Sequence, residues 1–186
     1  MKRKIEITIL LIVSILIINV DGTYAKTSKN LVRNPGFESS DFSMWKYKGT
    51  GMDKLDYYTE APVGIWDKED DCHSGNYTFH FWSTYKHHFR LEQTISKKKL
   101  NKKKTYKASV YIQGDEVGKN AEIYLYVIAD RKKYVSGLVE LDGWQDWKKV
   151  TIDNIKCTKG DVKIGVYVDH ACLLYTSPSP RDLSTS

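Results

Sequence analysis

The sequence predicts an all-β protein, a two-layer antiparallel β-sandwich, from three observations. Apolar and polar residues alternate with a period of two, as in residues 89–95, 106–113 and 162–168. Turn-forming residues separate these runs, for example at 113–118 and 158–161. The period of 3.6 that marks a helix is not sustained, so we expect no helix longer than a turn or two. Many short amphipathic strands divided by turns are typical of two sheets packed face to face.

Residues 1–25 have the features of an export signal peptide. Three basic residues at positions 2–4 precede an uncharged run from Ile7 to Ile18, and Thr23-Tyr24-Ala25 offers small residues for cleavage. The apolar run is too short to span a bilayer comfortably, although an uncleaved anchor is the alternative. We expect cleavage after Ala25, a secreted, extracellular product and no stable membrane insertion after cleavage.

The first strong strand is predicted where residues 74–76 release the chain into Tyr77–Phe81. Alternation places the three aromatic residues of this strand on a core face, whereas His80 and Trp82 face the other way. Trp45, further upstream, is expected to fill one end of the core. The later strands have these inward residues: Tyr106, Ala108, Val110 and Ile112; Ile123, Leu125 and Val127; Val150 and Ile152; Val162, Ile164, Val166 and Val168.

The chain carries a formal net charge of +6, and much of the excess lies in residues 97–104. This lysine-rich run lies between two strand patterns and contains no interleaved aromatic residues. We therefore expect a solvated loop and no nucleic-acid partner, although such a run can also attract an anionic polymer.

Cys72 and Cys157 are the two cysteines that precede the last fifteen residues. In an exported chain they are candidates for a disulfide bond. Sequence alone does not place two cysteines within bonding distance, so the paired and unpaired states both stay open. The spacing of cysteine and histidine residues does not indicate a zinc site.

Several segments resemble the galactose-binding-like β-sandwiches of carbohydrate-binding modules. The resemblance begins with Asn30–Glu38 followed by Trp45, and with Cys72–Trp82. It continues, in the expected order, through Leu91–Ile95, Thr105–Gly114, Leu141–Trp147 and Val162–Val168. Residues 73–83 and 106–114 are most similar to the β-1,4-galactan-binding modules of arabinogalactan endo-β-1,4-galactanases. The resemblance implies a jelly roll whose final strand, with its pair of aspartates, is missing from this sequence.

The last residues have a different character. Cys172–Asp182 resembles a translated sequencing-library adapter through all of its residues in one frame. A flexible Ser/Pro linker is the alternative for the same composition. We expect residues 172–186 to be an adapter-derived tail, and the domain proper to comprise residues 26–171.

Sugar recognition in water combines aromatic rings, which cover the C–H face of a pyranose, with planar polar groups that bond its hydroxyls. Strand alternation selects residues that point away from the core. The candidate ligand contacts are Trp82, Tyr126, Tyr124, Tyr111, Gln113, Arg90, His80 and Glu92, with Tyr167 and Asp169 on the last strand and Trp66 as a second-rank contact in a polar loop. They form one platform if their strands are neighbours in one sheet; packing in cross-strand pairs is the alternative.

The resemblance also implies a structural calcium ion near the meeting point of the first and last strands. Glu38, backbone carbonyls near His73 and an aspartate of the final strand would supply the oxygen ligands that Ca²⁺ prefers. The first two are present and the third is missing. The acidic segment Asp67–Asp71 is a second calcium candidate, with a solvated loop as the alternative.

These observations predict a non-catalytic module that binds β-1,4-galactan or a related plant cell-wall polysaccharide. We expect a monomeric N-terminal module of a larger secreted glycoside hydrolase, such as an arabinogalactan endo-β-1,4-galactanase. The alternatives are a stand-alone secreted or cell-surface adhesion module and, third, a small glycosidase. A glycosidase needs two carboxyl groups in one cleft, and Asp169 is the one candidate partner for Glu92.

Overall fold

The computed structural model describes residues 9–12, 29–41, 43–50, 63–66, 72–81, 87–114, 121–141, 143 and 145–170. Strands dominate these residues, and no helix among them is long and apolar enough to cross a membrane. The elements are β1 Ile9–Ile12, β2 Lys46–Thr50, β3 Val63–Trp66, β4 Thr78–Phe81, β5 His87–Ile95, the 3-10 turn η2 Lys97–Lys99, β6 Thr105–Gly114, β7 Glu122–Ala129, β8 Lys132–Val135, β9 Gln145–Lys156 and β10 Val162–His170.

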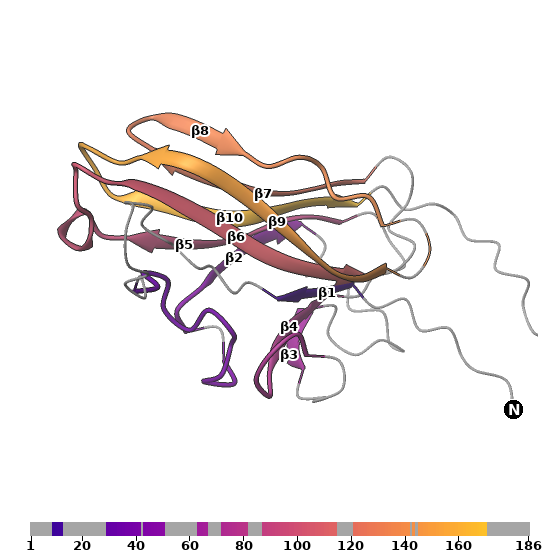
Figure 1. The fold of residues 1–186 in the computed structure, drawn as a ribbon. Helices are drawn as coiled ribbons and strands as arrows, with labels where there is room; N and C mark the ends of the chain where they lie inside the picture. Colours follow the sequence, from indigo (N-terminus) through magenta and orange to yellow (C-terminus); the bar gives the residue numbers. More distant parts are fainter. Residues whose placement is uncertain are drawn as a thin grey trace, which may run out of the picture.

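The strands form two five-stranded sheets that lie in two layers (Figure 1). Sheet A has the order β3-β4-β1-β6-β9, and sheet B has the order β2-β5-β10-β7-β8. Every pair of neighbouring strands is antiparallel. The prediction of an all-β, two-layer antiparallel sandwich is therefore confirmed.

The interior of sheet A contains a strand from the segment predicted as a leader. β1 lies between β4 and β6, with Leu11 opposite Phe79 on one side and opposite Ile112 on the other. Figure 1 shows the same arrangement, with β1 beside β6 and β4 beyond it. The sequence analysis does not anticipate this strand, because a short apolar run has the same composition in a leader and in a buried strand.

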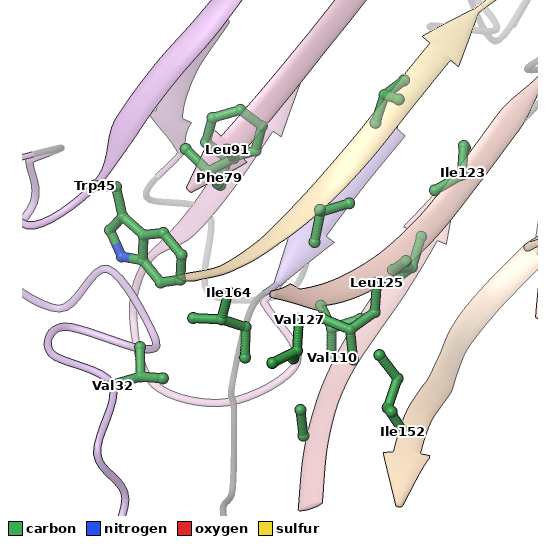
Figure 2. Close-up of a cluster of buried hydrophobic side chains, with 14 of the residues drawn as sticks. Val32, Trp45, Phe79, Leu91, Val110, Ile123, Leu125, Val127, Ile152 and Ile164 are labelled. Carbon is green, nitrogen blue, oxygen red and sulfur yellow. The ribbon is translucent and has the colours of Figure 1, made fainter. Parts of the chain in front are cut away.

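The core fills the space between the two sheets with the residues that alternation predicts. Phe79, Leu91, Val110 and Leu125 are completely shielded from solvent, and Figure 2 shows them among labelled side chains from both layers. Burial of each such side chain stabilises the fold by about 1.5–3 kcal/mol. The predicted inward residues of β6, β7 and β10 are all buried. The hydrophobic pattern was therefore sufficient to assign the inner face of these strands.

Trp45 fills the end of the core, as predicted. Its side chain is buried, its ring centroid lies 5.6 Å from that of Phe37, and its indole N–H donates to the carbonyl oxygen of Asn34 at 3.0 Å. The buried polar atom thus has the partner it needs. This bond attaches the loop that contains Asn34 to the buried Trp45 ring.

Candidate functional site

The outer face of sheet B brings together predicted candidates from adjacent strands. Because β5, β10 and β7 are neighbours, their register aligns Arg90 with Tyr167 and Tyr167 with Tyr124. Two residues further along each strand, Glu92 aligns with Gly165 and Gly165 with Tyr126. We call the following five side chains the sheet B site: Arg90, Glu92, Tyr124, Tyr126 and Tyr167.

The first row of the sheet B site is a stack of two rings with a cation at each end. The rings of Tyr167 and Tyr124 are stacked, with centroids 4.7 Å apart and planes inclined by 22°. Arg90 Cζ lies 5.6 Å from the Tyr167 centroid, and Lys133 Nζ lies 4.8 Å from the Tyr124 centroid. Sheet order places the two cations on opposite sides of the ring pair, because β5 and β8 flank β10 and β7. Both tyrosines are half-buried, whereas Arg90 and Lys133 are exposed.

The second row depends on a glycine. Tyr126 Oη donates a hydrogen bond to Glu92 Oε1 at 2.6 Å, although a strand lies between their two strands. The residue between them is Gly165, where an added Cβ would lie 2.9 Å from Tyr126 Oη and 2.6 Å from the carbonyl oxygen of Leu91. The absence of a side chain at position 165 therefore allows this bond to cross the middle strand.

The Glu92 carboxylate is a buried anion held by cations. It is 4% exposed, and its Oε2 lies 3.2 Å from Lys48 Nζ and 3.6 Å from Lys163 Nζ. Burial raises the pKa of Glu92, but the hydrogen bonds from Tyr126 and Lys48 and the charges of the two lysines lower it by more, so the pKa lies below its ordinary value. Burial and the adjacent Glu92 raise the pKa of the Tyr126 phenol. At neutral pH the pair is an ionised carboxylate and a protonated phenol.

A histidine lies beside the first row, because His88 is the register partner of Asp169 in the next row. His88 Nδ1 lies 3.2 Å from Tyr167 Oη, and the two rings meet edge to face with centroids 5.0 Å apart. The same nitrogen lies 3.7 Å from Asp169 Oδ2. Burial and the charge of Asp169 raise the pKa of the Tyr167 phenol. Tyr167 is therefore fixed by contacts on three sides: Arg90, Tyr124 and His88.

Other predicted contacts lie on the opposite sheet. Tyr111 and Gln113 are in β6, His80 is in β4 and Trp66 is in β3, all strands of sheet A. The side chains of His80 and Trp66, and all of Trp82, lie outside the described residues. The single platform expected from the sequence is therefore divided between two sheets, because alternation identifies a face of each strand but not its sheet.

Some candidates that were expected on an open surface are buried. Tyr126 is 2% exposed and Gln113 is 6% exposed, in addition to Glu92. In the sheet B site, Tyr126 and Glu92 are buried because their side chains cover one another above Gly165. On sheet A, the Tyr111 ring stacks on the ring of His73 at a centroid distance of 3.6 Å. Some of the residues predicted to contact a ligand are thus packed against other strands or loops of the protein.

Glu38, a predicted calcium ligand, has a different set of partners in this structure. Its carboxylate accepts from the backbone N–H of Asn76 at 3.2 Å and of Tyr77 at 3.3 Å. The side chain of His73 packs on aromatic rings, with Trp147 edge-on at 5.7 Å. Among the described residues, no cluster of three acidic, histidine or cysteine side chains is present, whereas Ca²⁺ takes six to eight oxygen ligands. These donors do not fit a calcium site without further ligands, and the Asp67–Asp71 loop lies outside the described residues.

The two cysteines are not joined by a disulfide bond in the described structure. Cys157 is buried directly after β9, and burial together with the charge of Asp130 raises the pKa of its thiol to about 11. Cys72 is half-buried in the segment before β4. The buried Cys157 thiol is consequently a weak nucleophile at neutral pH.

Several contacts of the sheet B site were not identified from the sequence: Lys48, Lys133, Lys163, His88 and Gly165. Lysines that alternate with apolar residues are typical of any solvated strand, so their pattern does not distinguish them. Comparison with known proteins adds no further assignment: no family model, curated protein or solved structure matches the chain.

Proposed function

We propose that the sandwich is a non-catalytic glycan-binding module that holds β-1,4-galactan, or a related plant cell-wall polysaccharide, on the outer face of sheet B. The observation that carries this proposal is the row of Arg90, Tyr167 and Tyr124. Three adjacent strands present these side chains on one face, and their chemistry suits a sugar ligand. The sequence resemblance to galactan-binding modules supports the choice of ligand.

The chemistry of the row suits a neutral sugar. The ring faces of Tyr167 and Tyr124 are stacked on each other, so it is the outward ring edges that offer apolar surface to pyranose C–H groups. The two hydroxyls and the guanidinium offer hydrogen bonds to sugar hydroxyls. Arg90 is exposed and lies on the outer side of Tyr167, so its guanidinium is free to move from the ring to a ligand hydroxyl. The second row, anchored by the Tyr126–Glu92 bond, supports these residues from one side.

The position and ionisation of Glu92 favour binding over hydrolysis by a Glu92–Asp169 pair. Asp169 stands four residues along β10 from Gly165, the register partner of Glu92. Four residues of strand span roughly 13 Å, beyond the 5–9.5 Å that separates the carboxyl groups of glycosidases. Glu92 is also held as an anion, whereas a general acid needs a raised pKa. Both observations favour a binding surface.

Affinity electrophoresis of the full chain against galactan, arabinan, xylan and cellulose tests the proposal. We expect retardation by galactan, and loss of most of it in Tyr167→Ala and Arg90→Ala. Lys102→Ala, in an exposed turn outside both sheets, is the matched surface control and should retain wild-type retardation. Thermal melts establish that each variant is folded.

Two results would overturn the proposal. Retardation by none of the four polysaccharides would remove the glycan-binding function. Loss of galactan binding in Tyr111→Ala, with Tyr167→Ala unaffected, would place the site on sheet A and contradict the sheet B site.

A further inference from the structure

The position between β4 and β6 has an unusual occupant. In the described residues β4 and β6 each pair with β1 and not with one another, so β3 and β4 join the rest of sheet A through β1. β1 belongs to the apolar run that the sequence predicts as a removable leader. A segment expected to leave the protein therefore occupies the middle of one sheet.

The register shows that this position is part of the sandwich. Leu11 is opposite Phe79 and Ile112, and Ile9 is opposite Phe81. These three partners are completely shielded from solvent and belong to the core. Residues 9 and 11 thus stand at register positions of the core face, as the alternation of an apolar strand requires.

An empty position here would be costly. Adjacent strands lie about 4.8 Å apart, so removal of one strand leaves a gap of roughly 9.6 Å that β4 and β6 cannot bridge with direct bonds. Their facing N–H and C=O groups would lose their partners at the edge of a hydrophobic core. Proteins fill such gaps by β-augmentation, in which an extended peptide supplies the missing backbone bonds.

We propose that the position between β4 and β6 is a strand-acceptor site whose occupant is the chain's own segment, residues 9–12. The site holds this segment through the antiparallel backbone pairing and register described above, and the link through residues 13–28 is not needed for binding. A cut after Ala25 in the folded protein then leaves residues 1–25 as a non-covalent strand that other peptides of the same pattern can replace. This inference is independent of the proposed glycan binding.

A nicked form of the full chain tests this proposal. A protease recognition sequence inserted between Ala25 and Lys26, in protein expressed without export, allows the chain to fold before it is cut. We expect residues 1–25 to co-elute with the remainder in gel filtration after cutting. We also expect a labelled peptide of residues 1–14, which positions 2–4 keep soluble, to replace the cut fragment when added in excess.

Paired substitutions in the labelled peptide distinguish strand recognition from nonspecific adhesion. Leu11→Asp, opposite two fully buried residues, should weaken replacement at least tenfold. Leu10→Asp is the matched control, because position 10 aligns with two polar residues, His80 and Gln113, and not with the hydrophobic core, and it should have a clearly smaller effect. Equal effects of the two substitutions would contradict the register on which the site depends.

Hydrogen exchange on the same nicked protein gives a second measurement. Protection of the amides of residues 79–81 and 111–113 should fall when the fragment is removed and return when the peptide is added. Release of the fragment with this protection unchanged would overturn the proposal, because another segment of the chain would then hold the position. Failure of the peptide to restore lost protection would overturn it as well.

Discussion

The hydroxyl of Tyr126 donates a 2.6 Å hydrogen bond to the carboxylate of Glu92 across the intervening strand β10. The bond joins β7 to β5 over Gly165, and two lysines neutralise the remaining oxygen of the carboxylate. Since both partners are almost completely buried, neither finds water when the other is removed. The stability of sheet B should therefore depend on this pair more than on any exposed ion pair of the described structure.

Tyr126→Phe removes the donor and leaves the carboxylate with its lysines alone. We expect a loss of about 1.5–3 kcal/mol in the free energy of unfolding, because the bond is buried and has a charged acceptor. Tyr124→Phe is the control: its hydroxyl bonds the exposed Lys133, and its loss should change stability by less than about 0.5 kcal/mol. Urea unfolding measures both values, and equal losses would contradict the special role of the Tyr126–Glu92 pair.

Gly165→Ala tests the passage of this bond over β10. A Cβ there would stand 2.6 Å from the backbone oxygen of Leu91, a group that cannot move without disturbing the sheet. We expect destabilisation by about 1–3 kcal/mol through overpacking. Gly160→Ala, at which an added Cβ meets nothing within 4 Å, is the matched control and should be nearly neutral. Thermal unfolding of the two variants provides the comparison.

The lowered pKa of Glu92 predicts a dependence of stability on pH. Its pKa in the folded state lies below the ordinary value of 4.5, so the unfolded state binds the proton more tightly. The stabilisation by Glu92 is accordingly complete above about pH 5 and is lost as the pH falls through the folded-state pKa. Asp130, whose pKa is lowered to about 2 by hydrogen bonds from Thr158 and Lys159, adds a loss of the same sign at lower pH.

The substitution Glu92→Gln isolates the contribution of Glu92 to the pH dependence of stability. The difference in unfolding free energy between wild type and Glu92→Gln should be largest above pH 5. It should shrink below pH 4.5, where the unfolded wild type binds the proton and the folded carboxylate still does not. Glu140→Gln removes an exposed carboxyl and controls for the change in net charge. A Glu92→Gln difference that stays constant from pH 7 to pH 3 would contradict the lowered pKa.

Alternation along each strand was sufficient to predict the fold class and the core. The inward residues of β6, β7 and β10 were predicted because a period of two leaves no choice of buried face once one side is apolar. Trp45 was predicted for a related reason, since a large ring near the first strand fills the end of a sandwich. Neither inference requires knowledge of which strands are neighbours in a sheet.

Sheet membership was the part of the site that the sequence could not supply. Tyr111 and Tyr126 have the same outward position in their strands, yet they lie on different sheets. The partners of Glu92 come from β2, β7 and β10. Such long-range contacts depend on the spatial order of the strands in sheet B. β1 was missed for the same reason, since only the gap between β4 and β6 identifies its apolar run as a strand.

Gly75→Ala tests the turn in which Glu38 binds the backbone before β4. Gly75 has φ +76°, and an added Cβ would come within 2.2 Å of Glu38 Oε1. We expect the substitution to cost about 1–2 kcal/mol for the left-handed backbone, plus the displacement of the carboxylate from its two amide donors. Gly137→Ala, where nothing lies within 4 Å, is the control.

A double-mutant cycle separates the two contributions at this turn. In a Glu38→Ala background the carboxylate is gone, so Gly75→Ala should then cost the backbone strain alone. The cost of Gly75→Ala measured by urea unfolding should be smaller in that background than in wild type. An equal cost in the two backgrounds would mean that Glu38 does not hold the turn, and would leave its carboxylate free for another partner.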